Sequence, residues 1–273
     1  TCDNWEALCV DDGSEREFPD VVRSMRDPRF AYHRLERHEN ANVARNYGIL
    51  HSRGAYIAML DSDDEWLPNH LEASLRLLEA EKADGVYGSL ILRGAASTDR
   101  VVTTRRIGDG ESTIDFLLST GYGAQTSTLV MTAGSARATG WDANLGRHQD
   151  YDFVTRYRRR YKLAALLEPT VVYHQSAGPK AIDFHSCIRF IRGVEDEISP
   201  RIFLAYHRQM LRLAMSLGAE AAVLRHYREA VAGCVPFVSL TEHLTLLGPK
   251  NGWEAWKMKT RYLWRLLLLR VET

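Results

Sequence analysis

Short apolar runs alternate with amphipathic segments along about the first two-thirds of the chain. A continuous apolar run beside turn-forming residues is typical of a strand covered on both faces, and apolar residues spaced three and four apart are typical of a helix. Strands are predicted at residues 5–10, 30–35, 56–60, 86–92, 101–107, 128–131 and 163–173, and helices at 18–25, 43–50, 71–78, 114–118 and from about 151. This alternation predicts an α/β fold with a mainly parallel sheet flanked by helices.

The pattern changes after about Asp183, where long amphipathic segments at 202–217 and 219–231 follow without a convincing strand. We therefore predict an α/β domain over residues 1–180 and a helical C-terminal extension over 181–273. The segment 253–270 mixes tryptophans and leucines with lysines and arginines, a composition that can lie on an anionic membrane. Its apolar residues do not keep to one helical face, so packing against protein is favoured, and peripheral membrane contact stays open.

Charge and cysteine content argue against several classes of protein. The 35 basic residues balance the 35 acidic ones, so no overall charge favours nucleic acid as a partner. The four cysteines lie far apart without a CxxC pair, which favours a reducing cytosol over a disulfide framework or a zinc site. No apolar run approaches the roughly 18 residues of a membrane-spanning helix, and no signal peptide is recognised. The chain opens on Thr1, and we expect further residues upstream.

The most informative segment is the acidic cluster that follows the apolar run 56–60. Asp61, Asp63 and Asp64 end a predicted buried strand, and open α/β sheets bind ligands at the carboxyl ends of their strands. Carboxylates packed this closely repel each other unless a cation compensates, and oxygen ligands favour Mg²⁺ or Mn²⁺, which also bridge to substrate phosphates. The cluster therefore indicates a metal–diphosphate site. The alternative is an acidic turn in which Asp64 caps the helix that starts near Pro68.

Two earlier segments supply candidates for the same crevice. Asp11 and Asp12 end an earlier strand, where a carboxylate can accept hydrogen bonds from a nucleobase or a ribose, although an Asp-Gly turn is also common in ordinary loops. Arg45 lies on the helix that leads into the acidic strand, where it can reach a carboxylate or a phosphate. The alternative for Arg45 is an ordinary surface arginine on an amphipathic helix.

A later candidate is Asp150, at the boundary between a loop and a helix. Its carboxylate is either a general base aimed at the crevice or a capping residue that the helix dipole stabilises. Asp152 is two positions further along, about 200° around a helix, so the two side chains cannot face one substrate. We expect one of the two to be structural.

Four motifs, in this order along the chain, resemble glycosyltransferase family 2, the inverting sugar-nucleotide transferases of the Rossmann-like GT-A fold. The motifs are DDGS from Asp11, ARNYGI from Ala44, DSDDEWLP from Asp61 and HQDYDF from His148, and the resemblance covers about residues 1–176. The resemblance implies a substrate-binding role for Asp11, Asp12, Arg45, Asn46 and Asp61, with Asp12 at the nucleobase and Asp61 near the ribose. It implies that Asp63 binds Mn²⁺ or Mg²⁺, with Asp61 and His174 as further candidate ligands, and that Asp150 is the base.

The chain departs from the family pattern at three places. The family's opening strand is absent, so we expect an exposed sheet edge and an incomplete nucleobase pocket. Gln149 stands where the family usually has Glu, which removes a like-charged neighbour and leaves the base less basic. His174 lies near the position where relatives place a diphosphate or metal contact, but the surrounding sequence matches loosely and a structural histidine is favoured.

The resemblance implies a metal-dependent hexosyltransferase that uses a nucleoside-diphosphate sugar, most commonly a UDP-sugar, in polysaccharide or glycolipid synthesis. The expected acceptor is a glycan or glycolipid, and the expected location is the cytoplasm or the inner face of the membrane. Two other classes stay open. One is a phosphatase-type Asp-x-Asp hydrolase, although Glu65 and Trp66 follow the acidic pair where such enzymes usually have Thr or Val. The other is a non-catalytic sugar-nucleotide-binding module.

Overall fold

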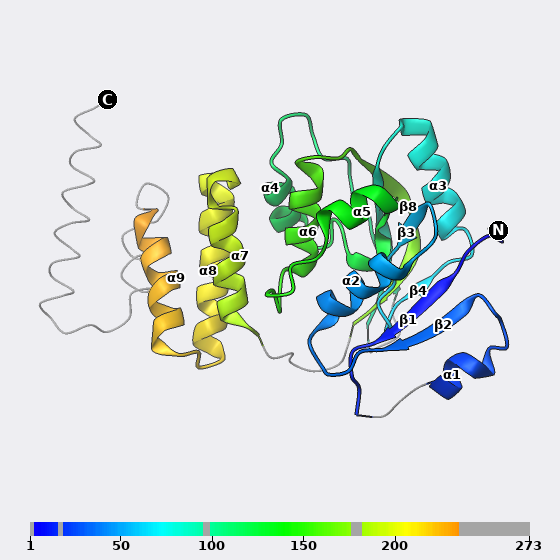
Figure 1. Ribbon diagram of the computed structural model, residues 1–273. Coiled ribbons are helices and arrows are strands. Elements are labelled where there is room, and N and C mark those ends of the chain that lie inside the picture. The colour runs from blue at the N-terminus through cyan, green and yellow to red at the C-terminus, as the bar shows by residue number, and fades with distance from the viewer. Residues whose placement is uncertain (1–2, 16–18, 95–98, 176–181, 235–273) are drawn as a thin grey trace, which may run out of the picture. The chain divides into compact units, whose positions relative to one another are not determined.

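The computed structural model describes residues 3–15, 19–94, 99–175 and 182–234 (Figure 1). The chain divides into two compact units, Thr1–Val194 and the part from Glu195 onward. The first unit contains β1 (Ala7–Asp11), α1 (Pro19–Ser24), β2 (Phe30–Arg34), α2 (Ala41–His51), β3 (Tyr56–Ala58), β4 (Glu65–Trp66), α3 (His70–Glu81), β5 (Gly85–Arg93), β6 (Asp99–Val102), α4 (Thr113–Thr120), the 3₁₀ turn η1 (Thr126–Thr128), β7 (Val130–Thr132), α5 (Ala133–Thr139), α6 (Gln149–Arg158), β8 (Leu163–His174) and α7 (Phe184–Gly193). The second unit contains the 3₁₀ turn η2 (Glu195–Glu197), α8 (Pro200–Ser216) and α9 (Ala221–Gly233).

The strands of the first unit form two sheets. β1 and β2 pair with each other in parallel, and the other six form a sheet in the order β3-β7-β5-β8-β4, with β6 paired to β5. Within the larger sheet, β5 and β8 are parallel, whereas the β3–β7, β5–β7, β5–β6 and β4–β8 pairs are antiparallel. β3 therefore lies at an edge of the larger sheet, immediately before the acidic cluster.

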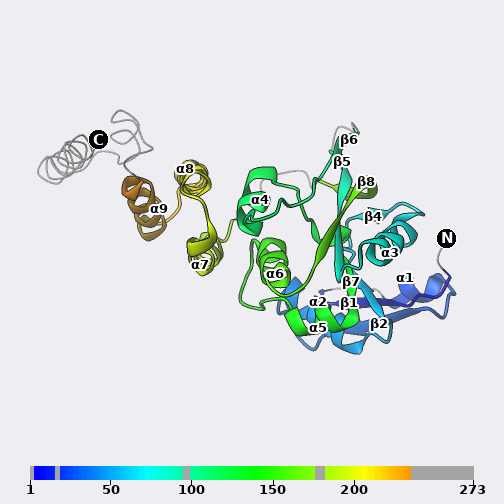
Figure 2. The same ribbon diagram turned by 90° about the horizontal axis from the view of Figure 1, so that it is seen from above.

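Helices cover both faces of the larger sheet (Figure 2). Alternate residues of each central strand point to opposite layers. Val86 on β5, Val130 on β7 and Ala164 on β8 pack with Leu78 of α3 on one face. Their neighbours in sequence, together with apolar residues of α4, α5 and α6, form the larger core on the other face; they include Tyr87, Phe116, Met131, Ala136, Phe153, Tyr157 and Ala165. This two-sided burial explains the nearly continuous apolar runs of these strands.

The α/β class and the helical C-terminal region are confirmed, but the sheet is mixed and less parallel than predicted. β5 ends at Arg93 and β6 begins at Asp99, and a connection this short allows only an antiparallel return. β7 and β4 have three and two residues, which is too short for the sequence pattern to show their direction. The predicted helices at 202–217 and 219–231 correspond to α8 and α9.

The unit boundary falls after Val194, whereas the predicted domain ended at residue 180. α7 therefore belongs to the first unit. This helix contacts the loop at residues 141–148, which is distant from it in sequence. Among the described residues, no helix is both long and apolar enough to cross a membrane. The segment 253–270, for which membrane contact was considered, lies outside the described residues.

Candidate active site

The acidic cluster forms the loop between β3 and β4, and Asp64 is its buried member. Its side chain accepts hydrogen bonds from Ser127 Oγ at 2.5 Å and from the backbone N–H of His174 at 3.1 Å. Burial raises the pKa of Asp64, and the nearby carboxylates of Asp63 and Asp61 raise it further. The helix that follows, α3, has Asn69 at its N-cap, so the alternative in which Asp64 caps this helix is wrong.

Ser127, in the turn η1, is a site residue that sequence reasoning missed. Its hydroxyl donates to Asp64 and also accepts the backbone N–H of Asp61 at 3.0 Å. One buried side chain therefore holds both ends of the acidic loop in place. No local signal marks this serine, because it lies more than 60 residues beyond the loop that it organises.

Arg45 connects the acidic loop with the segment that carries the predicted base. One guanidinium nitrogen donates to Asp61 Oδ1 at 2.7 Å, and another donates to Gln149 Oε1 at 2.9 Å. The guanidinium also lies over the ring of Trp141, 4.6 Å from its centroid. The side chain is only 14% exposed, so the alternative of an ordinary surface arginine is wrong. Two motifs separated by more than 80 residues thus meet at a single side chain.

The helix α2 also holds the loop that leads to Asp150. Asn42 is fully buried, and its amide donates to the backbone carbonyls of Asp142 at 2.6 Å and Leu145 at 3.0 Å. Asn46 donates to the carbonyl oxygen of Trp141 and accepts its N–H, both at 2.8 Å. The Asn46 amide is thus engaged with this loop, and its implied contact with the nucleotide stays a prediction.

Asp150 lies in the first turn of α6 and not at its cap, which is His148. Its Oδ1 accepts the N–H of Tyr151 at 2.9 Å. Burial raises the pKa of Asp150 to about 6, with the carboxylate of Asp61 also raising it and Arg45 lowering it. A carboxylate with such a pKa is well suited to accept a proton near neutral pH.

Asp152 is the structural member of the acidic pair in α6, and the geometry explains why. Its Oδ2 pairs with Arg156 at 2.6 Å, and Arg156 in turn donates to the backbone carbonyls of Thr139 and Gly140. The ion pair between Asp152 and Arg156 therefore connects α6 to the end of α5.

Tyr173, near the end of β8, lies within electrostatic reach of both acidic segments. Burial raises its pKa to about 12, and the carboxylates of Asp64, Asp63 and Asp150 are among the charges that raise it further. Its ring contacts that of Tyr122 with the centroids 6.1 Å apart. The next residue, His174, donates its backbone N–H to Asp64, so the end of β8 lies beside the acidic loop.

Asp11 and Asp12 lie at the carboxyl end of β1, as predicted, and both fix local loops. Asp11 accepts the hydroxyl of Tyr32 at 2.5 Å and the N–H of Ser14 at 2.9 Å. Asp12 accepts the N–H of Glu39 at 2.9 Å and pairs with His38 at 3.0 Å. Their implied roles in substrate binding, with Asp12 at the nucleobase, stay predictions.

The implied metal site was tested against the donors present. Among the described residues, no group of three or more His, Cys, Asp and Glu side chains is arranged to hold a metal ion. Mg²⁺ and Mn²⁺ do not require such a group, because they usually take one or two carboxylates and complete their coordination with water and substrate phosphates. The exposed carboxylate of Asp63 fits this mode, whereas Asp61, two residues earlier, is already paired with Arg45. His174 fits less well, since its Nε2 contacts Glu65 Oε1 at 2.8 Å.

A mixed α/β sheet with an acidic loop at its edge and a separate buried carboxylate nearby is the arrangement of a GT-A glycosyltransferase. Residues 1–185 match Glycosyl transferase family 2, and the chain belongs to this family. Family membership argues against the phosphatase-type hydrolase.

Individual relatives agree with this family. The amylovoran biosynthesis glycosyltransferase AmsB of Erwinia amylovora is 30% identical over 181 residues, which are 63% of this chain and 60% of AmsB. The Escherichia coli enzyme WfgD, a UDP-Glc:alpha-D-GlcNAc-diphosphoundecaprenol beta-1,3-glucosyltransferase, is 34% identical over 86 residues, 32% of this chain and 34% of WfgD. The chain thus spans less than two-thirds of either relative.

Among solved structures, S. aureus TarS 1–349 in complex with UDP superposes with a TM-score of 0.62 at 16% sequence identity, covering 94% of this chain and 79% of TarS. At this identity the likeness concerns the fold.

Proposed function

We propose that this protein is a metal-dependent, inverting glycosyltransferase that moves a sugar from a UDP-sugar to an acceptor hydroxyl in polysaccharide or glycolipid synthesis. The observation that carries the proposal is the bridge by Arg45 between Asp61 of the acidic loop and Gln149 beside Asp150. This bridge supports a shared region for the acidic loop and Asp150. The name of WfgD, with a UDP-sugar donor and a lipid-diphosphate acceptor, supports these substrate classes.

In this mechanism, Asp150 accepts the proton of the acceptor hydroxyl while that oxygen attacks the anomeric carbon from the side opposite the diphosphate. The bond from the anomeric carbon to the diphosphate oxygen breaks, its electron pair leaves with the diphosphate, and the configuration inverts. Asp63, together with Asp61, would hold Mn²⁺ or Mg²⁺. The metal ion would neutralise the negative charge that develops on the leaving diphosphate.

The raised pKa of Asp150 suits its role as base. Burial increases the affinity of the carboxylate for a proton even though Gln149 contributes no negative charge. Arg45 limits this increase and holds the neighbouring Gln149 in place, so the carboxylate stays largely ionised at neutral pH.

The test compares Asp63→Ala and Asp150→Asn with the unchanged protein, using a panel of UDP-sugars and lipid-linked acceptors. We expect both substitutions to reduce transfer by at least 100-fold, in line with the 10²–10⁴-fold contribution of a general base. UDP binding in the presence of Mn²⁺, measured by calorimetry, is expected to weaken in Asp63→Ala and to stay unchanged in Asp150→Asn. Normal turnover by the Asp150→Asn variant would exclude Asp150 as the base. Absence of transfer and of UDP binding in the unchanged protein would instead favour a non-catalytic module.

A further inference from the structure

The helix α7 contacts the loop at residues 141–148 although it lies beyond the last strand of the sheet. Its N-cap, Asp183, accepts the N–H of Ser186 at 2.9 Å, so the helix begins with a satisfied cap. The following residues of α7 then bond directly to the backbone of the loop that leads to Asp150.

The hydroxyl of Ser186 makes two hydrogen bonds to one residue of this loop. It accepts the N–H of Arg147 at 3.0 Å and donates to the carbonyl oxygen of the same residue at 3.3 Å. Ser186 is 1% exposed, so water cannot readily replace these bonds. One turn further along α7, Arg189 donates to the carbonyl oxygen of Asn144. α7 thus fixes the loop at two points, and one of them is three residues before Asp150.

Phe190 completes the contact by packing against the start of α6. Its ring centroid lies 5.0 Å from that of His148 and 6.4 Å from that of Tyr151. His148 has a left-handed backbone with φ of 59°, which a residue other than glycine adopts only at a cost. The aromatic packing therefore holds an unfavourable backbone turn directly before the helix that carries Asp150.

We propose that α7 is a positioning element for the base, in which Ser186, Arg189 and Phe190 hold the loop so that Asp150 faces the acceptor hydroxyl. The proposal rests on the proposed function, in which Asp150 accepts the proton. The proposal gives α7 a role in the reaction, although this helix contains none of the four sequence motifs. Loosening of α7 is expected to impair the chemical step while the donor, which the acidic loop holds, still binds.

A matched pair of exposed arginines on α7 tests this role. Arg189→Ala removes the bond to Asn144, whereas Arg192→Ala removes another exposed arginine, for which the described part of the chain shows no bond to the loop. Ser186→Ala removes both bonds to Arg147, and Ser186→Thr restores the hydroxyl. Because Arg189 is exposed, its variant is expected to fold even where the buried substitution does not.

We expect kcat to fall 3- to 10-fold in Arg189→Ala and Ser186→Ala, with KM for the UDP-sugar within twofold and full activity in Arg192→Ala. Ser186→Thr is expected to recover most of the lost rate. The second readout is the titration of Asp150 by carbon NMR of its carboxyl group, whose midpoint is expected to move from about 6 toward 4 when the loop loosens and water enters.

Unchanged kcat and an unchanged Asp150 titration in both folded variants would overturn the positioning role, as would equal losses in Arg189→Ala and Arg192→Ala. The titration separates this result from failure of the proposed function. If Asp150→Asn keeps full activity, the base assignment fails, while a shifted titration in Arg189→Ala still shows that α7 controls the environment of Asp150.

Discussion

At the scale of single residues, Arg45 determines the electrostatic character of the site. Its guanidinium lies between two regions of carboxylates, pairs with Asp61 and bonds to the neutral Gln149. A fixed, largely buried cation lowers the cost of holding these negative charges close together. It also carries rigid donors in a planar fork, which a lysine could not reproduce. Arg45 therefore couples the geometry of the acidic loop to that of Asp150.

The pKa of Asp150 leads to a prediction about the pH dependence of transfer. Burial raises this pKa from 3.8 to about 6, and the base functions only when it is deprotonated. We therefore expect kcat/KM to be flat above about pH 6.5 and to fall about tenfold for each pH unit below 6. Initial rates between pH 5 and 8 at a fixed Mn²⁺ concentration measure this profile.

The control for this profile is UDP binding over the same range, which separates loss of the base from loss of the donor. Binding that stays constant while the rate falls assigns the loss to the chemical step. A rate that stays on its plateau down to pH 5 would contradict the raised pKa of Asp150.

The candidate carboxylates could be selected from the sequence because each follows a recognisable pattern, and their roles stay predictions. Asp61 and Asp63 end an apolar strand, and Asp150 opens a helix. It did not predict Ser127 or Ser186, because a buried serine looks the same in any sequence until the fold brings it to a distant partner. Ser127 lies more than 60 residues from its carboxylate, and Ser186 lies 39 residues from Arg147.

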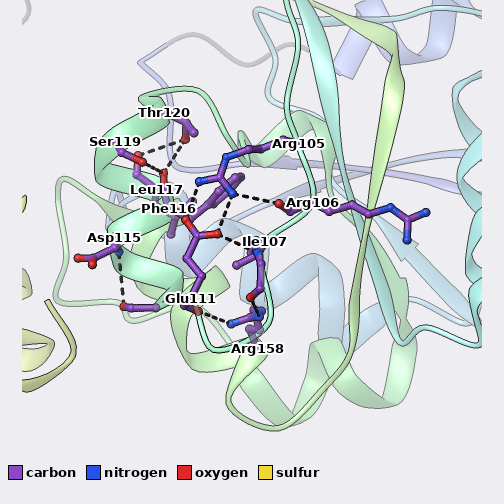
Figure 3. A network of polar contacts seen from close by, with 12 residues as sticks. Arg105, Arg106, Ile107, Glu111, Asp115, Phe116, Leu117, Ser119, Thr120 and Arg158 are labelled. Atoms are coloured by element: carbon purple, nitrogen blue, oxygen red, sulfur yellow. Dashed lines mark hydrogen bonds and ion pairs between the residues drawn. The ribbon is translucent and has the colours of Figure 1, made fainter. Parts of the chain in front are cut away.

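At the scale of elements, the segment between β6 and α4 is fixed by a network of charges (Figure 3). Arg105 donates to both carboxylate oxygens of Glu111, at 2.7 and 2.5 Å, and Gly108 adds a backbone N–H at 2.8 Å. Arg158, from the end of α6, donates to the backbone oxygen of Glu111 at 3.1 Å and to Thr113 at 3.2 Å. The network therefore joins the loop to the helix that carries Asp150.

Removing the charge of Glu111 is expected to destabilise this loop. The hydrogen bonds from Arg105 lower the pKa of Glu111 from 4.5 to about 2. The ionised Glu111 side chain therefore contributes fully to the free energy of unfolding above pH 4.5, and this contribution disappears as the pH falls toward 2. We expect Glu111→Gln to lower the free energy of unfolding by about 1 kcal/mol at pH 7, since solvent screens a partly exposed pair. The difference from the unchanged protein is expected to shrink below pH 4.5.

Denaturant unfolding at several pH values measures this effect, with Asp109→Asn as the control. Asp109 is an exposed carboxylate in the same loop, so its substitution changes the net charge equally without removing the network. Equal destabilisation by both substitutions would show that net charge, rather than the bonds of Glu111, sets the stability of the loop.

The longer elements were predictable from sequence and the shorter ones were not. β5 and β8 are apolar runs buried on both faces, and α2, α3, α8 and α9 show helical spacing over three or more turns. By contrast, β4 has two residues and α5 has seven, so their conformation depends on the neighbours they meet in the fold. No helix was predicted over α7, and its partner, the loop before Asp150, is distant in sequence.

At the scale of the whole molecule, every residue assigned to the site belongs to the first compact unit, which ends at Val194. The division also distinguishes two possible ends for a minimal active fragment. A fragment ending at residue 180 would lack α7, whereas one ending at 194 would keep it.

We therefore expect the fragment 1–194 to bind UDP with Mn²⁺ as the full chain does. This fragment keeps the acidic loop, Arg45 and α7, the helix that contacts the loop before Asp150. The fragment 1–180 loses the bonds from Ser186 and Arg189 to the loop, so its melting temperature is expected to be lower by several degrees. Thermal shift with and without UDP, applied to both fragments and to the full chain, measures the two effects together. If the fragment 1–194 shows no stabilisation by UDP while the full chain does, the second unit takes part in donor binding, and the site is not confined to the first unit.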